Sequence, residues 1–90
     1  MKTNDNSPFP ERLKQARTRF GISQKQLGIA AGIDQFVASA RMNQYERGVH
    51  TPEFKTVKAI AKALNVPTAY FYCEEDELAE IVIEWSERDK

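Results

Sequence analysis

The sequence predicts an all-α fold. Apolar residues recur at helical spacing in five segments of the chain, and no segment alternates apolar and polar residues as a half-buried strand would. Gly21, Gly32, Gly48, Pro52 and Pro67 all fall between those segments, where residues that break helices are expected. With 90 residues, of which 41% are hydrophobic and 29% charged, the chain has the composition of one globular domain.

The N-terminal residues divide into a polar arm and a first helix. Residues 1–7 are polar and show no periodicity, so we expect a flexible arm. From residue 8 the pattern becomes helical and runs to Gly21. The buried face of this helix is expected to consist of Phe9, Leu13, Ala16 and Phe20.

The stretch from Ser23 to Gly48 predicts two helices joined by a turn. Ser23 is an N-cap type, and Leu27, Ala30 and Ala31 supply a buried face. A glycine inside a helix costs on the order of 1 kcal/mol relative to alanine, so Gly28 indicates that another backbone packs closely there. We expect Gly32 to end this helix and Asp34 to cap the next one.

The second helix of the pair has two chemically different faces. Ala38, Met42 and Tyr45 form one apolar stripe, and short polar side chains lie off it. In the major groove, asparagine and glutamine pair with an adenine edge and arginine pairs with guanine. Asn43 and Gln44 therefore suit base reading.

A fourth helix, a short fifth helix and an acidic C-terminal helix complete the chain. Domain boundaries are expected at residues 8–72 for the bundle and 73–90 for the acidic helix. The fourth helix, ending at Asn65, should bury Phe54, Val57, Ile60, Ala61 and Leu64, and the fifth should carry Tyr70 and Phe71 into the core.

The C-terminal helix carries an apolar stripe that needs a partner. This stripe consists of Leu78, Ile81, Val82 and Trp85, and the opposite face is acidic. One alternative is packing against the same chain. The other is pairing with the same helix of a second chain, which would give a dimer. The two alternatives are compatible.

The charges separate along the chain although the net charge is zero. Residues 1–66 hold 11 Lys and Arg against 5 Asp and Glu, and residues 67–90 hold 2 against 8. We expect a basic binding surface and an acidic extension kept away from nucleic acid. A single cysteine, no signal-peptide pattern and no apolar run of about 20 residues predict a cytoplasmic protein, with no metal site and no cofactor.

Several motifs give the chain a family resemblance. RLKQAR, GISQKQLGIAAGI, NQYERG, TPEF and AIAKALNV follow one another from Arg12 to Phe71 in the order and spacing of the lambda-repressor-like (Xre-type) helix-turn-helix family. That family includes phage repressors, Cro proteins and many small bacterial regulators. The resemblance implies a compact five-helix DNA-binding domain, to which the C-terminal amphipathic helix is an addition.

One departure falls inside the helix pair. Gly32 and Gly48 are 16 positions apart, about one helical turn more than in the family. The additional residues lengthen either the second helix or the turn before it. Because Phe36 and Val37 are not typical turn residues, a longer helix is favoured.

The resemblance also implies residue roles. It places an ion pair between Arg17 and Glu46, which would hold the reading helix at a fixed angle. The family's base-contacting positions fall on Ser39, Ala40, Asn43 and Gln44. Arg41, at the flank of the apolar stripe, is a further base-contacting candidate. The candidates for phosphate contacts are Gln24, Arg47, His50, Thr51 and Lys55.

These features favour a sequence-specific, double-stranded-DNA-binding regulator of transcription that acts as a homodimer. The alternative is an antitoxin-like or other partner-binding module that uses the C-terminal helix to hold a protein. An enzyme is not expected, because no nucleophile is paired with a base and no glycine-rich phosphate loop is present.

Overall fold

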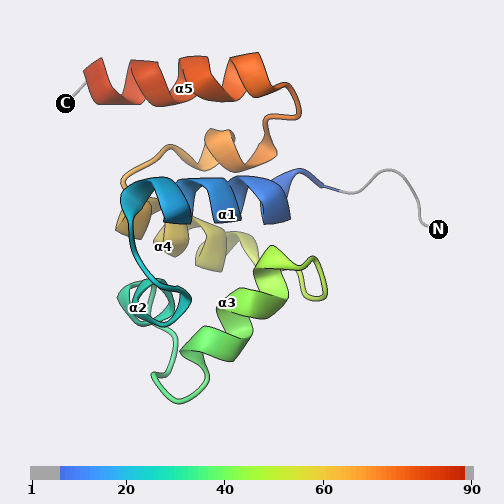
Figure 1. Cartoon of the computed structure of the whole chain (residues 1–90), viewed down its shortest axis with the longest axis vertical. Helices are drawn as coiled ribbons and strands as arrows, with labels where there is room; N and C mark the ends of the chain where they lie inside the picture. The colour runs from blue at the N-terminus through green and yellow to red at the C-terminus, as the bar shows by residue number, and fades with distance from the viewer. Residues whose placement is uncertain (1–6, 89–90) are drawn as a thin grey trace.

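Helices stacked in layers make up residues 7–88, the part of the chain that the computed structural model describes (Figure 1). Figure 1 shows α5 at one end of the long axis, α2 and α3 at the other, and the remaining helices between them. The all-α prediction is confirmed. The arm predicted for residues 1–7 lies almost wholly outside the described residues. The helices are α1 (Phe9–Phe20), α2 (Gln24–Ala30), α3 (Ala38–Glu46), α4 (Phe54–Leu64), the 3-10 helix η1 (Thr68–Tyr72) and α5 (Asp76–Arg88).

The core lies where α1 to α4 and η1 meet. The largest fully buried side chains are those of Phe71, Leu13, Leu27, Met42, Ile60 and Val57. Three residues expected in the core are exposed: Phe20, Ala30 and Phe54. They are the last residue of α1, the last of α2 and the first of α4, so the helices carry them past the edge of the core.

Several predicted helix ends are confirmed by their hydrogen bonds. The Ser23 hydroxyl accepts from the Gln26 backbone N–H at 3.0 Å, and the Gln26 side chain accepts from the Ser23 N–H at 3.1 Å, which is a capping box. Gly32 has φ +91°, and the next residue, Ile33, donates its N–H to the Gly28 carbonyl at 2.9 Å. Asn65 adopts the left-handed conformation expected of it, with φ 60°.

Arg12 attaches the C-terminal segment to α1. It is 5% exposed, and its guanidinium donates to the carbonyl oxygens of Cys73 at 2.8 Å and Glu74 at 3.2 Å. It also bonds the Gln15 side chain at 2.9 Å and pairs with Asp76 at 3.1 Å. The fork of five N–H donors on one arginine can serve several acceptors at once. No pattern in the sequence indicates that this residue is buried.

Two tyrosines of η1 lie close to this attachment. Burial raises the pKa of Tyr70 above its ordinary value, against the opposing effect of the Arg19 and Arg12 cations. Burial also raises the pKa of Tyr72. Tyr70 is 2% exposed and its ring packs edge-on against Phe71 with a centroid distance of 5.6 Å, so the neutral phenol belongs to the core.

Helix α5 packs on its own chain mainly through residues outside its predicted stripe. Ala79 and Ile83 are buried, and Val82 is half-buried. Leu78, Ile81 and Trp85 are 45%, 58% and 53% exposed. The helix therefore has one face on the bundle and leaves most of the predicted stripe open to solvent.

Candidate nucleic-acid interface

The additional residues of the helix pair form a longer turn. Helix α2 ends at Ala30 and α3 begins at Ala38, so residues 31–37 connect them, and α3 has nine residues. The expectation of a longer reading helix is therefore wrong. Asp34 does not cap α3 either, because its carboxylate accepts from the Phe36 N–H at 2.8 Å and the N-cap residue is Val37.

The two helices approach closely at Gly28 of α2 and Ala38, the first residue of α3. A Cβ atom built on Gly28 would lie 2.7 Å from the Cβ of Ala38, which is fully buried. The inference from sequence that another backbone packs against Gly28 is confirmed. The residues before Ala38 form a hydrogen-bonded turn, in which the Asp34 carbonyl accepts from the Val37 N–H at 3.1 Å.

Glu46 joins three helices through its carboxylate. It forms an ion pair with Arg17 of α1, and one of its oxygens accepts from the Gln24 amide of α2 at 3.0 Å. The Arg17 guanidinium also donates to the Ile22 carbonyl at 3.1 Å. The Glu46 side chain is only 5% exposed and that of Arg17 15%, so the pair is buried between the helices and fixes the angle of α3.

The outer face of α3 carries the predicted base-contacting residues. Ser39, Ala40 and Arg41 are exposed, whereas Asn43 and Gln44 are half-buried. Within residues 7–88, neither amide side chain hydrogen-bonds to another residue, so both retain their donors and acceptors for a ligand. The inner face buries Ala38, Met42 and Tyr45, as the apolar stripe predicts.

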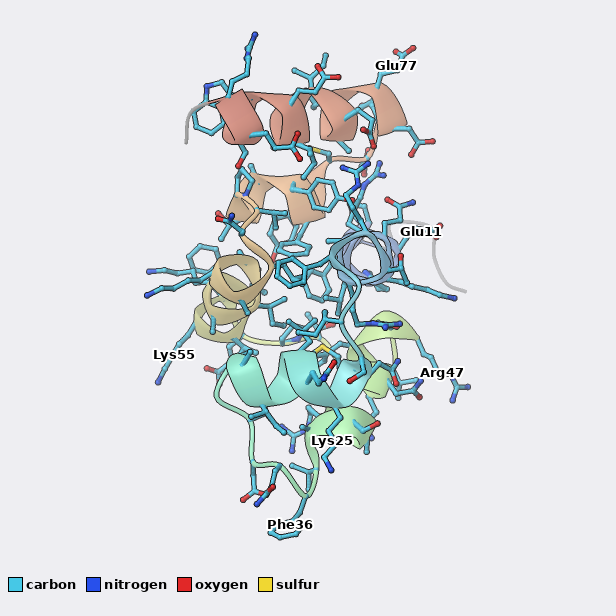
Figure 2. The ribbon with its side chains drawn as sticks, turned by 60° about the vertical axis from the view of Figure 1, so that its left-hand side comes forward. Glu11, Lys25, Phe36, Arg47, Lys55 and Glu77 are labelled. Carbon is cyan, nitrogen blue, oxygen red and sulfur yellow. The ribbon has the colours of Figure 1, made fainter. Side chains whose placement is uncertain are left out.

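The residues predicted to bind phosphate do not all lie together. Gln24, Asn43 and Arg47 line one hollow together with Lys14 of α1, which the sequence did not single out. Arg47, His50 and Thr51 line a second hollow beside the start of α1. Figure 2 shows Lys55 on the opposite side of the bundle from Arg47.

Part of the Gln24 side chain is already in use within the bundle. Its side-chain amide already donates to Glu46. The first N–H groups of an α-helix have no intrahelical acceptor. In α2 the Gln26 N–H is capped by Ser23, and Ser23 and Gln24 line the hollow together with Lys14 and Arg47. Arg17 and Glu46 also line that hollow and pair with each other, so an anion there would meet Lys14 and Arg47 beside a carboxylate.

The acidic helix lies far from this face. Figure 1 shows α5 separated from α2 and α3 by α1, η1 and α4. Arg19 of α1 pairs with Glu80 of α5 at 2.9 Å, so part of the acidic charge is directed at the bundle. The charge separation seen in the sequence is therefore also a separation in space.

Neither a metal site nor a membrane span is present in the part of the chain described. Residues 7–88 contain no group of three or more His, Cys, Asp and Glu side chains placed to hold a metal ion. Over the same residues, no helix combines the length and apolar character needed to cross a bilayer.

The comparisons with known proteins agree with this helix pair. A family model for the helix-turn-helix matches residues 13–71. Two uncharacterized HTH-type transcriptional regulators, from Sinorhizobium medicae (strain WSM419) and Rhizobium meliloti (strain 1021), are each 30% identical over 78 residues, which cover 80% of this chain and 53% of theirs. The chain thus spans about half the length of these curated relatives.

A solved structure resembles the chain more extensively. The crystal structure of the transcriptional regulator BswR matches with a TM-score of 0.83 at 56% identity, covering 87% of this chain and 77% of that one. The fold defines a helix-turn-helix protein. The chain belongs to the lambda-repressor-like helix-turn-helix family of DNA-binding transcriptional regulators.

Proposed function

We propose that this chain is a sequence-specific, double-stranded-DNA-binding regulator of transcription that acts in the cytoplasm as a homodimer. One observation carries the DNA-binding part: α3 presents Asn43 and Gln44, with their amides unused within residues 7–88, at the end of the molecule away from the acidic helix. The major groove, about 12 Å wide, admits an α-helix.

In this proposal the exposed face of α3 reads base edges. Asn43 and Gln44 each offer an amide that can pair with adenine, and Arg41 offers a guanidinium for guanine. Ser39 and Ala40, at the start of the helix, are small enough to let its backbone approach the bases. The buried Arg17–Glu46 pair links α3 to α1 and so holds these side chains in a fixed orientation relative to the bundle.

Phosphate contacts are proposed for the residues that surround α3. Arg47, His50 and Thr51 follow the helix, and the first turn of α2 precedes it. Contacts of this kind fix the orientation of a protein on the duplex without reading sequence. Lys14, which shares a hollow with Arg47, extends this set.

The homodimer is proposed from the symmetry of the open stripe on α5. Leu78, Ile81, Val82 and Trp85 are spaced symmetrically about a point between Ile81 and Val82. In an antiparallel pair with a two-fold axis at that point, Leu78 of each chain faces Trp85 of the other, which is the self-complementary pairing that such an axis requires. A dimer would present two α3 helices to half-sites about 34 Å apart.

Selection of bound duplexes from a random pool tests the DNA-binding proposal directly. We expect a palindromic site, because a two-fold dimer reads two identical half-sites. The Asn43→Ala variant should keep the fold and relax the preference at one position of each half-site. Failure of the wild-type chain to enrich any sequence would overturn the proposal.

The exposed stripe on α5 also favours a second candidate function, an antitoxin-like or other partner-binding module. In that case the stripe would be covered by another protein rather than by a second copy. The two candidates differ in the isolated chain: the regulator is expected to be a dimer with Trp85 shielded from quenchers. The partner-binding module would be a monomer with Trp85 accessible.

A further inference from the structure

The turn between α2 and α3 presents an aromatic ring to solvent. Phe36 is 88% exposed, more than any other large hydrophobic residue in residues 7–88. Figure 2 shows it at the tip of the molecule, pointing away from the bundle, at the end opposite α5. Single exposed apolar residues are common on protein surfaces, so exposure alone does not assign Phe36 a role. Its position relative to α3 is more informative.

Hydrogen bonds and buried neighbours hold the backbone of the turn, from which the ring projects, in a defined place. The Asp34 carboxylate accepts from the Phe36 N–H at 2.8 Å, and the Asp34 carbonyl accepts from the Val37 N–H at 3.1 Å. Both ends of the turn are anchored, because Ile33 packs against the core and Ala38 is fully buried beside Gly28. Phe36 is thus carried on a hydrogen-bonded loop between two fixed points.

This place lies directly before the reading helix. Ser39 and Ala40, the first exposed residues of α3, follow Phe36 by only three and four positions. The N-terminal part of a recognition helix contacts base edges in the major groove. A ring that precedes this part on the same rigid unit would enter the same groove.

The chemistry of the ring selects one feature of that groove. A phenyl ring has no hydrogen-bond donor or acceptor, and the apolar group of the major groove is the C5 methyl of thymine. Insertion between base pairs from the minor groove is the other known use of phenylalanine, but it requires approach from the opposite side of the duplex. The placement of Phe36 ahead of α3 favours packing against the methyl group.

We propose that Phe36 is a further specificity-determining residue, which contacts the methyl group of a thymine beside the bases read by Asn43 and Gln44. This inference rests on the proposed DNA-binding function. In this role the longer turn lets each subunit of the dimer contact one more base pair of DNA than α3 reaches by itself.

Replacing thymine by uracil in the duplex tests this role, because uracil lacks only the methyl group. On the site selected by the wild-type chain, each thymine is replaced in turn and affinities are measured for the wild type and for Phe36→Ala. We expect one flanking thymine where loss of the methyl weakens wild-type binding about fourfold, the value for one buried methyl. At that position alone, Phe36→Ala should bind both duplexes equally.

A matched variant and two contrary outcomes complete the test. Phe20→Ala removes another exposed ring, beside α5, and should show the wild-type response to uracil. A selected site without a flanking thymine, or a Phe36→Ala variant with the full wild-type response, would overturn the role of Phe36 and leave the proposed function intact. Absence of any selected site would overturn the proposed function first.

Discussion

The backbone of Gly28 in α2 lies against Ala38 at the start of α3. A Cβ atom on Gly28 would be 2.7 Å from the Cβ of Ala38, 3.0 Å from its carbonyl oxygen and 3.1 Å from its Cα. Two of these three neighbours are backbone atoms, which a rotamer change cannot move aside. This packing therefore sets the distance between the two helices of the motif.

Gly28→Ala should destabilise the protein although alanine is the better helix former. The helix preference contributes about 1 kcal/mol in favour of alanine, but overpacking against a fixed backbone costs about 1–3 kcal/mol or more. We expect the free energy of unfolding, measured in urea, to fall. Gly28→Ala combined with Ala38→Gly should recover only part of it, because the backbone atoms of residue 38 would still clash with the new methyl group. Full recovery would show that only the two methyl groups clash.

Arg12→Lys should detach the start of α5 from α1. A lysine has one charged nitrogen and cannot bond the carbonyls of Cys73 and Glu74 as the guanidinium does. We expect the free energy of unfolding to fall by about 1.5–3 kcal/mol, the range for hydrogen bonds to a charged group. Amide hydrogen exchange in α5 should accelerate.

Asp76→Asn is the control for the arginine variant. The Asp76 side chain is 91% exposed, so its ion pair with Arg12 is screened by water and should contribute less than about 1 kcal/mol. A loss of stability as large as that of Arg12→Lys would mean that the ion pair, and not the bonds to the carbonyls, holds the segment.

These interactions also show which parts of the fold can be predicted from sequence. Helix ends marked by Ser23, Gly32 and Gly48 are local features, and the structure has them where the sequence places them. The burial of Arg12 depends on carbonyls 61 and 62 residues away, and no local pattern distinguishes it from Lys14 on the same helix. Long-range interactions of this kind leave no mark on helical periodicity.

In the candidate site, too, local features were predicted from the sequence and long-range contacts were not. Residue types on α3 suggested base reading, and the glycine at position 28 suggested close packing. The length of the turn was not predicted, because residue types at Phe36 and Val37 favoured a helix where the structure has a turn closed by hydrogen bonds to Asp34. The hollow that brings Lys14 to Arg47 requires three helices in place, so sequence spacing alone could not reveal it.

Arg47→Ala should weaken DNA binding on all sequences and reduce its salt dependence. Neutralising one phosphate releases about one counterion, so the slope of log K against log salt should decrease by about 0.9 when Arg47 no longer pairs with a phosphate. Lys55→Ala removes the same charge on the opposite side of the bundle and should change the slope less. Equal slopes for Arg47→Ala and the wild type would exclude Arg47 from the proposed phosphate-binding residues, whereas a large effect of Lys55 would extend the DNA-binding face around α4.

Ile81→Glu should abolish the proposed homodimer. Ile81 is 58% exposed and lies next to the proposed two-fold axis, so the substitution would place two carboxylates close together in the interface. Sedimentation should show a dimer for the wild-type chain and a monomer for this variant. Val49→Glu introduces the same charge at another exposed apolar residue, outside α5, and should remain a dimer.

The salt dependence of dimerisation tests the proposed pairing of two α5 helices independently. Glu77 and Glu84 are exposed beside the stripe, so two α5 helices would bring like charges together. Because salt screens such repulsion, the dimer should tighten as ionic strength rises, while DNA binding by the same protein weakens. A dimer that dissociates in salt, or one that survives Ile81→Glu, would place the interface on another surface.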